Sequence, residues 1–217
     1  MENLGFVETR KLLTEYRIPF GKSKLADSKK EAAAFAGKIG YPVVLKVSSK
    51  KPLHKTDLGL VKLDIKDAKE LEKAWSEIIE TAEKKIRQPA EKIEGILVQK
   101  ELKGEEIMIG MKRDAQFGPV IMFGLGGIFV EALKDVSFRI APVKKENAYR
   151  MMGEIKGHKV LQGLRGQKPV NLDKLAEIIV ALSKLSLAEK KIKEIDLNPV
   201  IANERGAQVA DARFLIL

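Results

Sequence analysis

Apolar side chains recur at every third or fourth position in several long segments of the chain, which is the spacing of amphipathic helices. In the first segment this makes Val7, Leu12, Leu13 and Tyr16 available for one buried face. The most regular segment includes Trp75, which we therefore expect in a hydrophobic core rather than stacked on a cofactor. The pattern predicts helices over residues 3–17, 27–40, 66–87 and 171–188.

Shorter apolar segments have the pattern of strands. Residues 41–48 form an almost unbroken apolar run, which is typical of a buried strand, and residues 59–65 alternate as a half-buried strand does. Beyond Pro89, three successive runs indicate an antiparallel series joined by short turns, and the last two strands flank a turn at residues 203–206. The pattern predicts strands over residues 41–48, 59–65, 95–102, 105–114, 117–124, 193–203 and 207–217.

The order of these elements indicates an α+β fold in two lobes. We expect an N-terminal segment and first lobe at residues 1–98 and a second lobe at residues 99–217, with a hinge over residues 99–102. A chain of 217 residues is long enough to bury a sizeable core in this arrangement.

The amino-acid composition indicates the cellular compartment of the protein. The chain has no cysteine, which excludes disulfides and thiolate metal sites. The N-terminus has no apolar signal core, and the longest apolar stretch, residues 117–133, is interrupted by one proline and four glycines and is too short to span a bilayer. We therefore expect a cytoplasmic protein that does not associate with membranes.

The net charge of +10 raises the alternative of a nucleic-acid-binding module. The lysines, however, are spread among glutamates on the predicted helices, where they form i,i+4 pairs on a solvated face. Only 6% of the residues are aromatic, and no basic-aromatic cluster resembles a base-stacking platform. A positive charge suits a phosphate-handling protein equally well, and we expect no nucleic-acid partner.

Lys46 and a glycine-rich segment are the first candidates for chemistry. Lys46 lies inside the apolar run of a predicted strand, where an ammonium loses hydration unless an anion meets it. Taken alone it is more simply a lysine that points to solvent, but an ammonium is also a good phosphate ligand. Gly126 and Gly127 follow another apolar strand, and glycines let backbone N–H groups approach a phosphate closely. A plain tight turn would use the same residues.

A third group of polar residues lies near the C-terminus. Asp196 and Asn198 are two apart on a predicted strand and so project to the same side. Asp211 reaches the same place if the last two strands pair across the turn at residues 203–206. Carboxylate and amide oxygens, completed by water and nucleotide phosphates, suit Mg²⁺. Each residue alone is best explained as part of a polar surface turn, but the three together favour a metal site.

Long blocks of this sequence resemble the ATP-grasp β subunit of the ADP-forming acyl-CoA synthetases, typified by archaeal acetate–CoA ligase (ADP-forming). A more distant resemblance is to the β subunit of succinyl-CoA synthetase. The resemblance implies an ATP-grasp fold, with two α+β lobes that bind a nucleotide between them. The blocks that carry it are residues 41–59, 104–143, 161–166, 194–200 and 211–213.

The resemblance also implies roles for individual residues. Lys46 would hold nucleotide phosphates, Glu106 would contact the nucleotide at the ribose, and Asp196 would act in catalysis by orienting a phosphohistidine. Asn198 and Asp211 would be the Mg²⁺ ligands. The adenine pocket would be lined by the hinge, through backbone groups and the Glu101 side chain. The residues expected to bind the nucleotide are Lys46, Gln99, Lys100, Glu101, Leu102, Glu106, Gly126 and Gly127.

His54 matches the catalytic histidine of the β subunits. An imidazole near neutral pH is an unprotonated nucleophile and a good leaving group, as a phosphoryl relay requires. Lys55 could hold the passing phosphoryl group, and Asp57 could fix the imidazole tautomer. The chain has two histidines, and the other, His158, has no comparable match and is expected to be a bystander.

The implied enzyme is an acid–CoA ligase (ADP-forming) whose β subunit transfers a phosphoryl group from histidine to Mg-ADP, with Mg²⁺ and ATP/ADP as cofactors. No G-x-G-x-x-G motif follows a predicted strand, so the resemblance assigns CoA binding to an α subunit with its own phosphohistidine, in an α2β2 assembly. A stand-alone ATP-grasp carboxylate ligase that forms an acyl phosphate is the alternative, and would need no partner.

Overall fold

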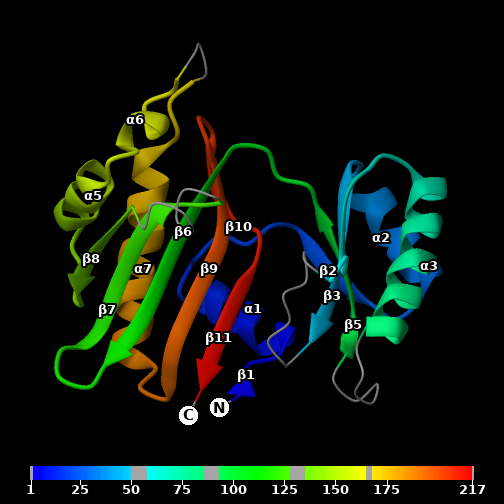
Figure 1. Ribbon diagram of the computed structural model, residues 1–217, viewed down its shortest axis with the longest axis horizontal. Coiled ribbons are helices and arrows are strands. Elements are labelled where there is room, and N and C mark those ends of the chain that lie inside the picture. Colours follow the sequence, from blue (N-terminus) through cyan, green and yellow to red (C-terminus); the bar gives the residue numbers. More distant parts are fainter. Residues whose placement is uncertain (1, 50–57, 86–92, 128–134, 165–167, 217) are drawn as a thin grey trace. The chain divides into compact units, whose positions relative to one another are not determined.

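A computed structural model describes residues 2–49, 58–85, 93–127, 135–164 and 168–216 of the chain (Figure 1). The chain divides into two compact units. Unit 1 comprises residues 1–4, 8–20 and 102–217, and unit 2 comprises residues 5–7 and 21–101. In the structure the chain passes from unit 2 to unit 1 between residues 101 and 102. The sequence places the domain boundary between residues 98 and 99, and that boundary stays a prediction.

Unit 2 is a four-stranded antiparallel sheet with two helices against one face. The strand order is β2-β5-β3-β4. Ser28 caps the helix at Lys29–Ile39 by accepting a hydrogen bond from Glu31 N at 3.3 Å, and Gly40 ends this helix. The elements are β2 (Ser23–Ala26), α2 (Lys29–Ile39), β3 (Val43–Ser49), β4 (Val61–Ile65), α3 (Ala68–Lys85) and β5 (Ile93–Lys100).

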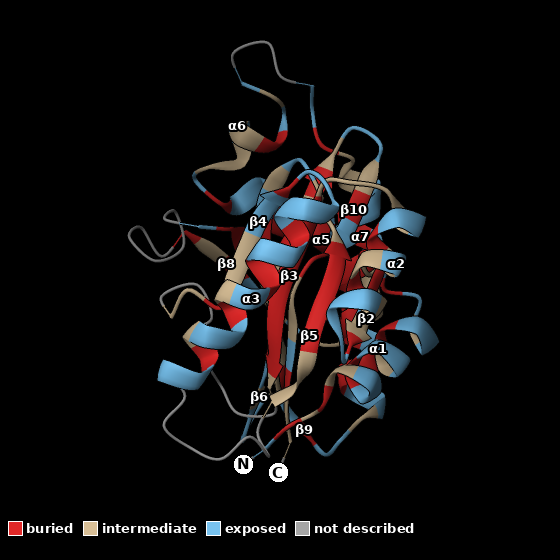
Figure 2. Cartoon of the chain, turned by 90° about the vertical axis from the view of Figure 1, so that its right-hand side faces the viewer, coloured by how far each residue is buried: buried red, intermediate tan, exposed pale blue. Residues whose placement is uncertain are grey.

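The core of unit 2 lies between the sheet and the helices α2 and α3. Figure 2 shows β3 and β5 as buried strands, while the outer faces of α2 and α3 are exposed. Trp75 is 7% exposed and packs in this core, as predicted. Alternate residues of β3, namely Val43, Leu45 and Val47, face the same core. The opposite face of the sheet therefore carries the intervening side chains, among them Lys46.

Unit 1 is built on a seven-stranded antiparallel sheet. The strand order is β1-β11-β9-β6-β7-β8, and β10 also pairs with β9. The elements are β1 (Glu2–Asn3), α1 (Phe6–Glu15), β6 (Glu105–Asp114), β7 (Gly118–Leu125), β8 (Val136–Ile140), α5 (Lys145–Glu154), α6 (His158–Leu161), α7 (Leu172–Ala188), β9 (Ile192–Asn203), β10 (Gly206–Val209) and β11 (Ala212–Ile216).

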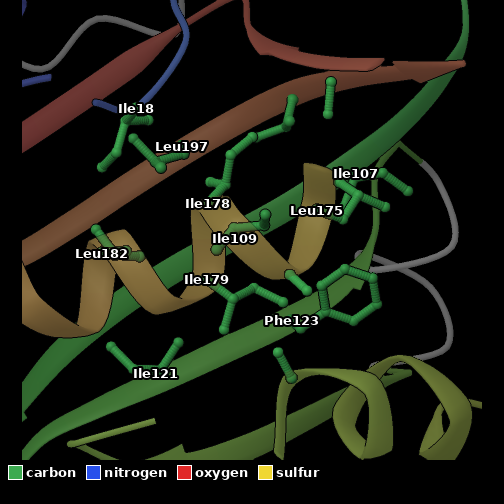
Figure 3. Close-up of a cluster of buried hydrophobic side chains, with 14 of the residues drawn as sticks. Ile18, Ile107, Ile109, Ile121, Phe123, Leu175, Ile178, Ile179, Leu182 and Leu197 are labelled. Atoms are coloured by element: carbon green, nitrogen blue, oxygen red, sulfur yellow. The ribbon is translucent and has the colours of Figure 1, made fainter. Parts of the chain in front are cut away.

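The long helix α7 covers one face of this sheet and forms most of the core with it. Figure 3 shows Ile178, Ile179 and Leu182 of α7 against the side chains of β6, β7 and β9. In β6 the odd-numbered Ile107 and Ile109 point to α7 and are fully buried. The even-numbered residues of β6 therefore lie on the other face, which is the face that carries the polar candidates.

The four predicted helices are confirmed, but one expected core residue is wrong. Val7 is 70% exposed. The buried stripe of α1 is formed by Thr9 and Leu13, which are four residues apart, and Val7 lies off that stripe. The short elements β1, β2, β8, α5 and α6 were not anticipated from the sequence.

Two expectations about strands are corrected. The run over residues 95–102 does not continue into an antiparallel series, because β5 pairs with β2 and β3 while β6 pairs with β7 and β9. The final run is two strands, since β10 ends at Val209 and β11 begins at Ala212. The hairpin at residues 203–206 is confirmed, with Asn203 Oδ1 accepting from Arg205 N at 2.9 Å.

Among the described helices, none combines the length and the apolar character that a membrane span requires.

Removing a core side chain from α7 should destabilise unit 1. Leu182 is 0% exposed, and we expect Leu182→Ala to lower the free energy of unfolding by about 2–5 kcal/mol, because it leaves a cavity against the sheet. The control is Leu187→Ala in the same helix, which is 40% exposed and should change the free energy by less than about 1 kcal/mol. Urea unfolding followed by circular dichroism measures both, and equal losses would contradict the packing described here.

Candidate functional site

Lys46 lies on the face of the unit 2 sheet that points away from α2 and α3. It is 8% exposed, which rules out the simpler interpretation of a solvent-facing lysine. Lys46 is opposite Leu97 on β5, and Val44, its neighbour on the same face, is opposite Gln99. Because side chains two apart share a face, the register places Lys46 and Gln99 on one surface of the sheet.

Gln99 is 2% exposed, and its Nε2 has no hydrogen-bond partner within the described residues. Glu101, directly after β5, has a buried Oε2 that likewise has no partner there. The intervening Lys100 differs, because its Nζ donates to the carbonyl oxygens of Gly40 at 3.1 Å and Tyr41 at 2.7 Å. The Lys100 ammonium is therefore engaged within unit 2.

In unit 1 the structure brings Glu106 and the two glycines together. Gly126 N donates to Glu106 O at 2.6 Å. A Cβ added at Gly126 would lie 2.8 Å from Cβ and 2.9 Å from the carbonyl carbon of Glu106, so only glycine fits this approach. Gly127 has φ +62, and a Cβ there would lie 3.5 Å from Glu106 Oε2. The exposed Glu106 and the glycine pair thus form one surface.

Asn198 lies at a bulge of β9. Ile107 and Ile109 of β6 are opposite Val200 and Leu197, so two residues of β9 face the single Met108. On the other side of β9, Asn198 N donates to Asp211 O at 3.1 Å, in the gap between β10 and β11. The predicted pairing of the last strands is confirmed in this respect, because it brings Asn198 and Asp211 side by side.

Asp196 is held in a cross-strand charge cluster that the sequence did not reveal. Arg213 of β11 is directly opposite Asp196. Its Nη2 lies 3.1 Å from Glu194 Oε1 and 4.0 Å from Asp196 Oδ2. Burial raises the pKa of the Asp196 carboxyl, Arg213 opposes this rise, and Glu194 and Asp211 add to it. The only sequence signal was Arg213 itself, at the end of the block at residues 211–213; its partner depends on the strand register.

A cavity of about 570 Å³ adjoins Asp196 on the same face of the unit 1 sheet. Its walls are largely apolar and include Met108, Met122 and Phe138, with Glu194 and Asp196 among the polar lining residues. Apolar walls withhold water from a carboxylate, which is consistent with the raised pKa of Asp196.

The described residues contain no group of three or more His, Asp or Glu side chains that could hold a metal ion by themselves. Asn198 and Asp211 nevertheless offer an amide and a carboxylate from adjacent backbone positions. Such hard oxygen donors fit Mg²⁺, which keeps several waters and takes phosphate oxygens as further ligands. The residues present therefore suit a Mg²⁺ ion that is bound together with a nucleotide.

The two histidines are in different situations. His54, with Lys55 and Asp57, lies outside the described residues. His158 is half-buried at the start of α6, with Nδ1 3.1 Å from Ile155 O. The backbone preceding it is fixed by the buried Asp135, which accepts hydrogen bonds from Lys156 N and Gly157 N at 2.7 Å each. His158 is thus held in place by local hydrogen bonds.

The sequence model of the ATP-grasp domain matches residues 1–216. This chain belongs to the ATP-grasp family. The ATP-grasp fold predicted from the sequence blocks is thereby confirmed, with a mixed α and β architecture in each unit.

Among ATP-grasp relatives, the β subunit of acetate–CoA ligase (ADP-forming) I from Pyrococcus furiosus is 47% identical over 210 residues, which cover 96% of this chain and 90% of that protein. Acetate–CoA ligase (ADP-forming) I of Archaeoglobus fulgidus is 48% identical over 206 residues, which cover 94% of this chain and 30% of that longer protein.

Among solved structures, the dinucleotide-forming acetyl-coenzyme A synthetase 1 of Ca. Korarchaeum cryptofilum, in complex with coenzyme A and Ca-AMPCP, superimposes with a TM-score of 0.94 at 41% identity. The match covers 100% of this chain and 94% of that chain. A second structure of that ATP-grasp enzyme, matched with a TM-score of 0.85 at 38% identity over 99% of this chain and 93% of that chain, holds coenzyme A and Mg-AMPPCP. Its phosphohistidine segment points towards the nucleotide binding site.

The contact between Gly126 and Glu106 should not tolerate a side chain. We expect Gly126→Ala to lower the free energy of unfolding by about 1–3 kcal/mol, because the added Cβ must displace the backbone of Glu106. Gly153→Ala in α5 is the control, since a Cβ there meets nothing within 4 Å and alanine favours a helix. If thermal unfolding shows both variants at the parent midpoint or above, the close approach is not a constraint.

Proposed function

We propose that this chain is the nucleotide-binding β subunit of an ADP-forming acetyl-CoA synthetase. The overall reaction would be acetyl-CoA + ADP + phosphate ⇌ acetate + CoA + ATP. This subunit performs the step in which the phosphorus–nitrogen bond of a phosphohistidine breaks and the β-phosphate of Mg-ADP gains the phosphoryl group. The match to the Pyrococcus furiosus β subunit over nearly the full length of both chains carries the proposal.

The two sets of described site residues support nucleotide binding. In unit 2, the buried Lys46 supplies a positive charge, and Gln99 and Glu101 supply polar atoms that have no hydrogen-bond partner among the described residues. In unit 1, Gly126 and Gly127 present backbone next to Glu106. We propose that Lys46 and the glycine pair bind phosphate oxygens and that Glu106 binds the ribose.

Asn198 and Asp211 are the proposed Mg²⁺ ligands. When bound, the ion would neutralise the phosphate charge that develops during transfer. Asp196, which is two residues from Asn198 and shares Arg213 with Glu194, is the group proposed to orient the phosphohistidine. Phosphoryl transfer depends on positioning and charge neutralisation, and these residues supply both.

The phosphoryl group must come from a second protein in this proposal. The word "subunit" in the name of the Pyrococcus furiosus relative indicates a partner, and the longer Archaeoglobus fulgidus relative is compatible with a fused one. We propose that the partner is a CoA-binding α subunit with its own phosphohistidine, assembled as α2β2 in the cytoplasm. His54 receives the phosphoryl group from it and passes it to Mg-ADP.

Removing the acidic metal ligand should weaken nucleotide binding. We expect Asp211→Ala to bind Mg-ADP roughly 10–100-fold more weakly than the parent, because the phosphate charge loses part of its Mg²⁺ neutralisation. Isothermal titration calorimetry with excess Mg²⁺ measures this, with Asp27→Ala as the control because Asp27 is exposed and belongs to unit 2. Parent-like affinity in Asp211→Ala would show that the metal is held elsewhere.

The two histidines provide a test variant and a control variant for the proposed phosphoryl relay. We expect His54→Ala to bind Mg-ADP as the parent does but to form no ATP when combined with the α subunit, acetyl-CoA and phosphate. The α subunit should then accumulate as its phosphorylated form. His158→Ala should keep its turnover, and the β chain alone should form no ATP from acetyl-CoA. Turnover by His54→Ala would reject the relay, and turnover by the chain alone would favour the stand-alone ligase.

A further inference from the structure

The buried carboxylate of Asp135 takes no part in the proposed nucleotide contacts. Asp135 is 8% exposed and directly precedes β8. Its Oδ1 accepts a hydrogen bond from Lys156 N and its Oδ2 accepts one from Gly157 N, each at 2.7 Å. Two successive N–H groups that turn toward one carboxylate satisfy a charge that would be costly to bury alone. Asp135 therefore fixes the backbone between α5 and α6.

Gly157 transmits this constraint to the end of β7 (Figure 1). A Cβ added at Gly157 would lie 2.4 Å from Leu125 Cδ1 and 3.2 Å from Asp135 Oδ2, so a side chain has no room there. The backbone of Gly157 has φ −76 and ψ 6, which residues with side chains also adopt in type I turns. Glycine is therefore required for space, and the turn at residues 155–158 packs directly against Leu125.

Leu125 connects this turn to the glycine pair. Leu125 and Asp135 are each the next residue beyond the last pair between β7 and β8, so they are also neighbours across the sheet. Leu125 is 2% exposed and pairs with Ile107 of β6. The residue after it is Gly126, whose N–H donates to Glu106 O at 2.6 Å. The position of Gly126 thus depends on how Leu125 is packed.

Glu106 and the glycine pair depend on different neighbours. Glu106 pairs with Ile201 of β9, on the side of β6 away from β7. Gly126 and Gly127 lie beyond the end of β7, and their place follows from Leu125 and from the contact with Glu106. A displacement of the turn at residues 155–158 should therefore move the glycines and leave Glu106 where it is.

We propose that Asp135 is a positioning residue, which holds Gly126 and Gly127 in place for the phosphates of the nucleotide. The inference rests on the proposed nucleotide-binding function and adds to it a residue that does not itself touch the ligand. It acts through Gly157 and Leu125. Binding groups are precise only where a supporting set of packed and hydrogen-bonded residues holds them, and Asp135 supplies that support here.

Mg-ADP and adenosine distinguish positioning of the phosphate site from general stability. Asp135→Asn keeps the size of the side chain but replaces one acceptor oxygen by an NH₂ group, which then faces a backbone N–H donor. We expect this variant of the full chain to bind Mg-ADP roughly tenfold more weakly, because the glycines are displaced. Adenosine has no phosphate, and its affinity should not change. Calorimetry measures Mg-ADP directly and adenosine by displacement of bound Mg-ADP.

Asp114→Asn is the matched control. Asp114 Oδ1 also accepts two backbone hydrogen bonds, from Gln116 N at 2.8 Å and Phe117 N at 2.9 Å. Asp114 ends β6, whereas Glu106 is near the beginning of that strand. Both affinities should equal those of the parent in Asp114→Asn. Leu182→Ala controls for lost stability, since it should keep the ratio of the two affinities.

A pair of size changes tests the contact itself. Gly157→Ala should weaken Mg-ADP and spare adenosine, because the added methyl group displaces Leu125. Leu125→Val removes the Cδ atoms that this methyl group meets. The double variant should therefore bind Mg-ADP more tightly than Gly157→Ala alone. Thermal unfolding shows which variants are folded, and the two Gly157→Ala proteins decide the matter if Asp135→Asn is not.

The outcomes separate this inference from the proposed function. A parent-like ratio of Mg-ADP to adenosine affinity in folded Asp135→Asn and Gly157→Ala would overturn the positioning role while nucleotide binding stands. Equal weakening of both ligands would also overturn it, because the loss would not be confined to the phosphates. A parent chain that binds neither ligand would overturn the proposed function and this inference with it.

Discussion

The extra residue of β9 opposite Met108 is the constraint on which the unit 1 site depends. Strand side chains alternate, so a shift of one residue moves every later side chain to the other face of the sheet. With the bulge, Leu197 and Val200 both reach the core under α7, although they are three residues apart. Asn198 is left at the irregular point, where its N–H meets Asp211 O. Core packing thus fixes where the proposed metal ligands lie.

In the unit 1 sheet one arginine lies close to two carboxylates. Arg213 is close to both Glu194 and Asp196, so neither carboxylate has the cation to itself. In unit 2 the Lys46 side chain is 8% exposed and lies on a strand face with Val44 and Ser48, opposite Leu97 of β5. Two carboxylates that share one cation in unit 1 and a buried lysine in unit 2 are groups of the kinds that bind, respectively, a divalent cation and phosphates.

Local pattern predicted the elements better than their partners. The apolar periodicity of α3 placed Trp75 correctly, and the bounds of β6 match the predicted strand at residues 105–114. Pairing could not be predicted, because alternation in β5 is compatible with either sheet and only packing on α2 and α3 selects one. The same limit hid Arg213, whose role depends on register. The Lys100 ammonium donates hydrogen bonds to the carbonyl oxygens of Gly40 and Tyr41, which lie sixty and fifty-nine positions away along the chain. Local sequence pattern could not identify these partners.

In the proposed function, this chain itself exchanges a phosphoryl group between a histidine and a Mg-nucleotide. The most direct measurement is incubation of the full chain, without any partner, with Mg²⁺ and ATP labelled at the γ-phosphate, followed by mapping of the labelled residue. We expect an acid-labile label at His54 that requires Mg²⁺ and returns to ATP when unlabelled ADP is added. A chain that binds Mg-ATP but acquires no label, or is labelled at a residue other than His54, would contradict it.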